Sequence, residues 1–98
     1  MPIRMKVYHQ GKETLVAAAD ADIVGKTFRE GKFKIEVGKF YEGAVVSEEI
    51  FVSQLKLATI GNFVGTETVE TAIRAGFVSD GGILWIDGVP HAQFVLMT

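Results

Sequence analysis

The polar side chains best placed for chemistry stand in a glycine-bracketed segment, Gly61-Asn62-Phe63-Val64-Gly65-Thr66, just before an expected helix. A loop at a helix N-terminus presents free backbone N–H groups and the positive end of the helix dipole, so this segment can hold an anion. The structural alternative is favoured. In that interpretation Thr66 only caps the helix, Asn62 satisfies nearby backbone groups, and the two apolar residues fill the core.

A second candidate is His91, which follows Pro90 beside an expected tight turn at Asp87. Its ring can act as a ligand, as an acid or base, or as a surface on which a nucleobase stacks. A half-buried ring bonded to the backbone is the structural alternative. A metal site shared with His9 would need the first and last strands to be neighbours, and we expect no metal. The serines form no Ser-His-Asp pattern, so we expect no catalytic residues.

The third candidate is a basic cluster. Residues 26–39 carry five Lys and Arg side chains against two Glu, a local charge of +3 in a chain whose net charge is −2. Such a cluster can contact RNA phosphates without reading sequence, although a solvated sheet face is the more ordinary explanation. The candidate phosphate contacts are Lys26, Arg29, Lys32 and Lys34, and the candidate specific contacts are Asn62, His91 and Gln93.

The composition excludes several functional classes. The chain has 98 residues, 48% of them apolar, and no cysteine, so it predicts one packed domain without disulfides, a thiolate nucleophile or a zinc ribbon. Gly25-Lys26-Thr27 matches only the end of a phosphate-binding loop, because Asp20 stands where the earlier glycine is required; we expect no cofactor. No apolar run spans a bilayer and no signal peptide is evident, which predicts a soluble, cytoplasmic protein with no membrane partner.

The elements that must position these residues can be predicted from residue patterns. Alternating or continuous apolar residues predict strands at 3–7, 15–18, 26–28, 33–37, 83–86 and 89–97. A first helix is expected from the Ser47 cap to about Ala58, and a second from the Thr66 cap to the C-cap Gly76. Asp20 or Asp22 is expected to start a single helical turn between strands.

These elements predict an α+β fold over residues 1–98, in which a mostly antiparallel sheet built from both chain ends packs against a two-helix hairpin. The first and last strands should share one sheet, because a single core must cover the apolar runs at both ends of the chain. Those runs also suggest that the last strands are covered on both faces.

Three blocks carry a resemblance to a known family: Gly25-Lys26-Thr27-Phe28-Arg29-Glu30-Gly31, Ala58-Thr59-Ile60-Gly61-Asn62-Phe63-Val64-Gly65, and Gly88-Val89-Pro90-His91-Ala92-Gln93. With them the chain resembles, from Met5 to Leu96, the uncharacterised archaeal domain-of-unknown-function family numbered four hundred and twenty-four. The resemblance implies a cytoplasmic archaeal protein of one domain, with an association with translation. It implies no activity and no site residues.

The function predicted from these observations is a non-enzymatic binding module for RNA or the translation apparatus. The expected partners are RNA or ribosome-associated proteins, and self-association into a homo-oligomer is left open. Two alternatives remain: a small anion-binding enzyme or hydrolase that uses His91 with Asp87 near Asn62, and a protein-interaction subunit. A concave site would favour the enzyme, whereas an open face can bind RNA.

Overall fold

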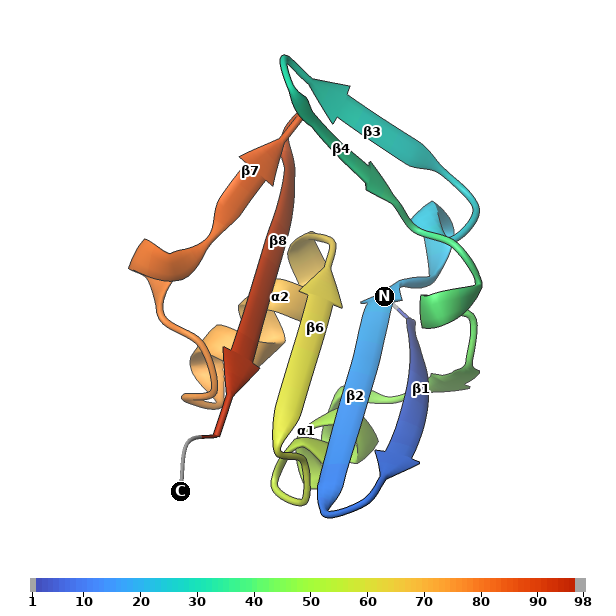
Figure 1. The fold of residues 1–98 in the computed structure, drawn as a ribbon, viewed down its shortest axis with the longest axis vertical. Helices are drawn as coiled ribbons and strands as arrows, with labels where there is room; N and C mark the ends of the chain where they lie inside the picture. The colour runs from blue at the N-terminus through green and yellow to red at the C-terminus, as the bar shows by residue number, and fades with distance from the viewer. Residues whose placement is uncertain (1, 97–98) are drawn as a thin grey trace.

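A computed structural model describes residues 2–96. These residues form eight strands, two α-helices and three short 3₁₀ turns (Figure 1). The elements in chain order are β1 (Ile3–Gln10), β2 (Glu13–Asp20), β3 (Thr27–Glu30), β4 (Phe33–Glu36), β5 (Ala44–Val46), α1 (Glu48–Leu55), β6 (Ile60–Val64), α2 (Thr66–Arg74), β7 (Leu84–Ile86) and β8 (Val89–Val95), with the 3₁₀ turns at Ala21–Ile23, Lys39–Tyr41 and Asp80–Gly82.

Six of the strands form one sheet in the order β5-β1-β2-β6-β8-β7, and β3 pairs with β4 in a separate hairpin. Every pairing in the large sheet is antiparallel except that of β2 with β6. The predicted α+β class is therefore confirmed. β1 and β8 share the sheet, as expected, although Met97 lies outside the described residues.

The segment between the two helices differs from the prediction. Residues expected to form a loop before the second helix instead form β6, which lies in the centre of the sheet between β2 and β8. Gly61 is required in this strand because a Cβ there would lie 2.4 Å from the Phe94 ring and 2.5 Å from the Phe63 ring. The glycine makes room for side-chain packing rather than for a turn, so the loop prediction for residues 61–66 was wrong.

The predicted helix ends are largely confirmed. Ser47 caps α1, since its hydroxyl oxygen accepts a hydrogen bond of 3.2 Å from the Ile50 backbone N–H. Gly76 follows α2 with a positive φ of 85°, as its predicted C-terminal role requires. Two details differ, because α1 ends at Leu55 and Thr66 is the first helical residue of α2 rather than its cap.

The two faces of the large sheet are covered unequally. Both helices lie behind it in the view of Figure 1 and bury one core against it, made of Ile3, Val16, Ala18, Phe51, Leu55, Ala58, Phe63, Val69, Ala72 and Ala92. On the near face a smaller core forms where the β3–β4 hairpin and the 39–41 turn pack on the sheet, and it comprises Ala17, Ala19, Ile35, Val37, Tyr41, Val64 and Ile86. The rest of the near face, called here the open face, has no second layer (Figure 1).

The last strands are less covered than the sequence suggests. On β7, Leu84 and Trp85 are exposed, and Val95 on β8 is exposed as well. β7 is a three-residue edge strand, so its apolar run reflects an edge rather than burial on both sides. Within residues 2–96, no helix is long and apolar enough to cross a membrane.

Candidate nucleic-acid interface

Asn62 occupies the middle of β6 and points to the open face, because Gly61 and Phe63 on either side of it point to the helices. Its Oδ1 accepts a hydrogen bond of 2.6 Å from the Tyr41 hydroxyl. The same oxygen lies 3.1 Å from Nε2 of His91. Since a carbonyl oxygen can only accept, Nε2 must carry the proton, and the neutral ring keeps a lone pair on Nδ1.

The protonation of both partners suits this arrangement. Burial raises the pKa of Tyr41 to about 12, so its hydroxyl keeps its proton and donates. Burial lowers the pKa of His91, so its ring is neutral at neutral pH. The distance between the Tyr41 and Asn62 oxygens is also typical of an O–H···O bond and short for an N–H···O bond, which places the carbonyl oxygen of the amide toward Tyr41.

Gln93 lies directly opposite Asn62 in the antiparallel pairing of β6 with β8, and its side chain is exposed. The three residues predicted as specific contacts therefore lie together on the open face. Tyr41, which holds the central amide, was missed. The only signal for it was an aromatic pair, Phe40-Tyr41, directly after the basic run, and no periodicity marks such a contact in advance.

Aromatic side chains flank this polar group. The ring of Tyr8 on β1 stacks on that of Phe40 with centroids 5.2 Å apart, and the Tyr8 hydroxyl donates to the Phe40 carbonyl. Phe40 is 39% exposed. Beside Tyr8 the surface forms a hollow of about 200 Å³, lined by Tyr8, Gln10, Glu13, Leu15 and Ile60.

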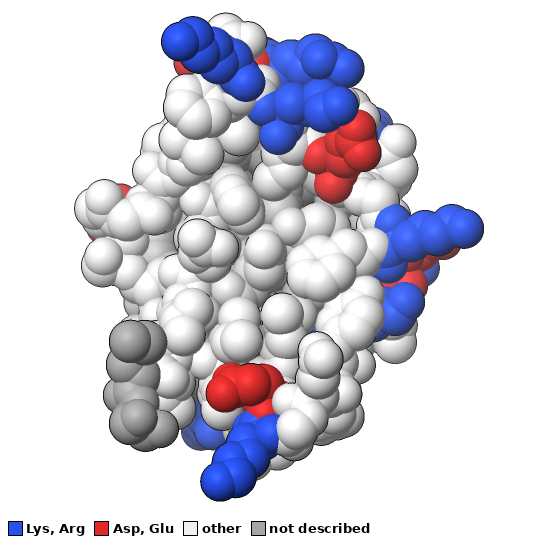
Figure 2. Space-filling view, viewed as in Figure 1, with Lys and Arg blue, Asp and Glu red and all other residues white. Residues whose placement is uncertain are grey.

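The predicted basic cluster lies on the β3–β4 hairpin and the residues just before it. Phe28 and Ile35 pair across the hairpin, where Ile35 belongs to the smaller core of the near face and Phe28 packs against it, whereas Arg29 and Lys34 pair on the outer side of the hairpin. Figure 2 shows Lys and Arg gathered where this hairpin lies, at the top of the view, and an uncharged surface across the middle of the sheet. The basic cluster and the polar group thus share one side of the molecule.

One of the four cations is partly engaged. Lys34 forms an exposed ion pair of 2.9 Å with Glu36, whose pKa it lowers by hydrogen bonding and by its charge. Among residues 2–96 no ion pair engages Lys26, Arg29 or Lys32, and all three are exposed. These three are therefore the side chains best placed to meet phosphates.

The N-terminus of α2 is already occupied by a carboxylate of the chain itself. Asp20, at the end of β2, accepts hydrogen bonds from the backbone N–H groups of Glu67 and Thr68 and from the Thr68 hydroxyl. The neighbouring Gly65 has a φ of 108° and must lack a side chain, because a Cβ would lie 2.5 Å from the Asp20 carboxyl carbon. An external anion would meet this carboxylate, which counts against the anion-holding alternative for this segment.

The structure supports neither of the other two arrangements considered for His91. Among the described residues no hydrogen bond joins His91 to Asp87, whose backbone N–H binds Glu30 instead. β2 and β6 separate β1 from β8, so His9 and His91 are not on neighbouring strands. The strand neighbourhood that a two-His metal site would need is therefore missing.

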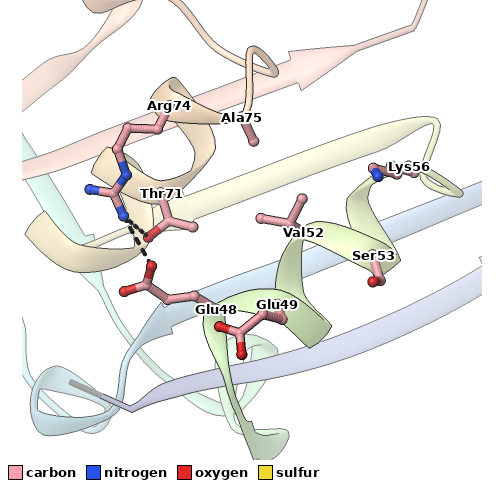
Figure 3. A pocket seen from close by; sticks show the side chains of 8 residues that line it. All are labelled: Glu48, Glu49, Val52, Ser53, Lys56, Thr71, Arg74 and Ala75. Carbon is pink, nitrogen blue, oxygen red and sulfur yellow. Dashed lines mark hydrogen bonds and ion pairs between the residues drawn. The ribbon is translucent and has the colours of Figure 1, made fainter.

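A separate groove of about 450 Å³ lies between α1 and α2, on the helical side (Figure 3). Arg74 crosses it, held by Glu48 at 3.0 Å and by the Thr71 hydroxyl at 3.3 Å. Lys56 and Ser53 lie on the far side of the groove in the close view. None of the predicted site residues lines this groove, and its Arg74 side chain is already paired with Glu48.

Comparisons with known proteins give a family and a fold. A family model described as "Protein of unknown function (DUF424)" matches residues 8–97. An uncharacterized conserved protein from Methanopyrus kandleri has a similar crystal structure, with a TM-score of 0.84 and 17% sequence identity over all of this chain and 96% of that one. At this identity the likeness shows the fold alone. The comparison with curated proteins found no match.

Proposed function

The chain belongs to DUF424, a family of proteins of unknown function, and for this member we propose binding of single-stranded RNA through the open sheet face and the β3–β4 hairpin. One observation carries the proposal. The basic hairpin and the Asn62, His91 and Gln93 group, which lie far apart in the sequence, are on the same side of the molecule.

The two parts of this surface suit the two parts of an RNA strand. Exposed Lys and Arg side chains on the hairpin meet the phosphates, which supply most of the affinity without sequence preference. The uncharged part of the sheet receives bases, since unstacked bases bind to aromatic rings and to polar side chains on an open β-sheet. Tyr8 and Phe40 supply the rings, and the amides supply hydrogen bonds.

The enzymatic alternative gains less support from the same surface. His91 is bonded to an amide, and no serine, cysteine or carboxylate lies in hydrogen-bond reach of its ring among residues 2–96. The helix N-terminus that would bind an anionic substrate holds Asp20. The proposal also retains two expectations from the sequence and the family resemblance, namely that the protein is cytoplasmic and that it is associated with translation.

The proposal is tested by neutralising Lys26, Arg29 and Lys32 together with Gln and titrating labelled single-stranded RNA at several salt concentrations. If each cation neutralises a phosphate, the slope of log affinity against log salt becomes shallower by about 2, at about 0.7 per contact. Lys56→Gln on the helical side is the control and should leave the slope unchanged.

Two outcomes would contradict the proposal. The wild-type protein could fail to bind RNA even at low salt, in which case the protein-interaction alternative replaces it. The triple variant could instead keep the full salt slope, which would place the phosphates elsewhere on the surface.

A further inference from the structure

We propose that Asn62 is the fixed hydrogen-bond donor of a subsite for one unpaired nucleobase, and that Tyr41 is the positioning residue that holds the Asn62 amide in the donating orientation. The inference rests on the proposed RNA binding and adds to it a site, a ligand group and an orientation. It requires that the base be unpaired, because in a duplex the base edge is already engaged.

The orientation of the Asn62 amide is set from two sides. Its Oδ1 has two lone pairs, and the Tyr41 hydroxyl and the His91 Nε2–H each donate to it. Rotating the amide by half a turn would place N–H groups against both donors and lose both bonds. The group that remains for a ligand is therefore Nδ2, which can only donate.

The Nδ2 group is available. Among residues 2–96 it has no hydrogen-bond partner, and no buried side-chain nitrogen or oxygen in this part of the chain lacks one. Nδ2 must therefore reach solvent, and it does so on the open face. By the same reasoning the unprotonated Nδ1 of His91 is an available acceptor.

The surroundings favour a base over a phosphate. Asn62, His91 and Gln93 carry no charge at neutral pH, and the exposed cations lie on the hairpin at the end of the same face. Ile60 and Leu15, which point to the same face two residues before Asn62 and Ala17, line the hollow beside Tyr8. A flat ring can therefore lie on an apolar and aromatic surface while its edge meets a fixed donor and the adaptable Gln93 amide.

The test compares two amide-to-acid substitutions on this face, each of which nearly keeps the shape of the original side chain. Asn62→Asp keeps an oxygen for Tyr41 and His91 and replaces the donor Nδ2 with an acceptor. Gln10→Glu adds the same charge at the exposed end of β1, where Gln10 lines the hollow but makes no hydrogen bond to Asn62. With labelled single-stranded RNA, Asn62→Asp should weaken binding about tenfold more than Gln10→Glu, because an acceptor of the base would face a carboxylate.

A second variant tests the positioning role. Tyr41→Phe removes one of the two donors that hold the amide, so single-stranded RNA should bind several-fold more weakly while the slope against salt stays that of the wild type. In the free variant, NMR should show the Asn62 side-chain amide signals shifted or broadened, and thermal melts confirm that the variant is folded.

The outcomes separate the inference from the proposed function. The inference is supported if the wild-type protein prefers single-stranded RNA to its duplex and Asn62→Asp loses more than Gln10→Glu. It is overturned, with RNA binding intact, if duplex RNA binds equally well or if the two acidic variants behave alike. If the wild-type protein binds neither RNA at low salt, the proposed function and the inference both fail.

Discussion

At the scale of single residues, Asp20 has the clearest energetic role. Its buried carboxylate, at the end of β2, accepts hydrogen bonds from the first backbone N–H groups of α2. Asp20→Ala should lower the free energy of unfolding by about 2 kcal/mol or more, since it removes a helix cap and leaves buried donors without an acceptor. Denaturant melts measure the loss. Asp22→Ala is the matched control and should change little, because Asp22 is exposed. Equal losses in the two variants would contradict the capping role.

His91 gives a prediction of pH dependence. Burial lowers its pKa in the folded protein, whereas in the unfolded chain the pKa stays at about 6.5. Below that value the unfolded chain binds more protons than the folded one, so stability is full above about pH 6.5 and falls as the pH drops toward the folded pKa. His91→Gln removes this contribution. Melts at neutral pH and at about pH 5 should therefore show a larger loss in the wild type than in the variant, and equal losses would contradict the burial argument.

Residue types alone identified only part of the polar group. Asn62 and His91 were singled out because an amide beside a glycine and a ring near a turn are conspicuous in a sequence, and Gln93 was named with them as a possible contact. The bond from Tyr41 to Asn62 and the capping of α2 by Asp20 were missed, because each joins residues distant in sequence, 21 positions apart for Tyr41 and 48 for Asp20 with Thr68. Such contacts follow from strand order, which the sequence does not display.

At the scale of elements, the start of α1 was predicted from local chemistry and can be tested by it. Ser47→Ala should cost about 1 kcal/mol in a denaturant melt, because the Ile50 N–H loses its acceptor. Ser53→Ala, at an exposed position inside the same helix, should be neutral or slightly stabilising, because alanine favours a helix. A null effect at Ser47 would mean that water caps the helix as well as the hydroxyl does.

The strand β6 shows why local chemistry fails elsewhere. Gly61 within it and Gly65 just after it are residues typical of a loop, yet Gly61 is small to admit two Phe rings and Gly65 to admit the Asp20 carboxylate. Local propensity was overridden by packing in the centre of the sheet. The Ser47 cap and the C-terminal role of Gly76 depend on neighbouring residues only, and for this reason they were predictable, whereas the start of α2, which the distant Asp20 caps, was not.

At the scale of the whole molecule, the difference between the two faces of the sheet governs the account. The helices bury one face, and the other keeps an uncharged surface bordered by a basic hairpin (Figure 2). The α+β class and the shared sheet of β1 and β8 followed from apolar patterning. The open face did not, because period-2 patterning gives two faces for each strand without saying which one a second layer will cover.

The central claim, that RNA binds on the open face, is tested most directly by NMR mapping with a short single-stranded RNA. The account predicts that the largest shifts on addition of RNA fall on the side chains of Asn62, His91 and Gln93 and on the β3–β4 hairpin. Residues around the groove between α1 and α2, such as Ser53 and Ala75, should stay unchanged. Shifts centred on that groove, or no shifts at low salt, would contradict the account.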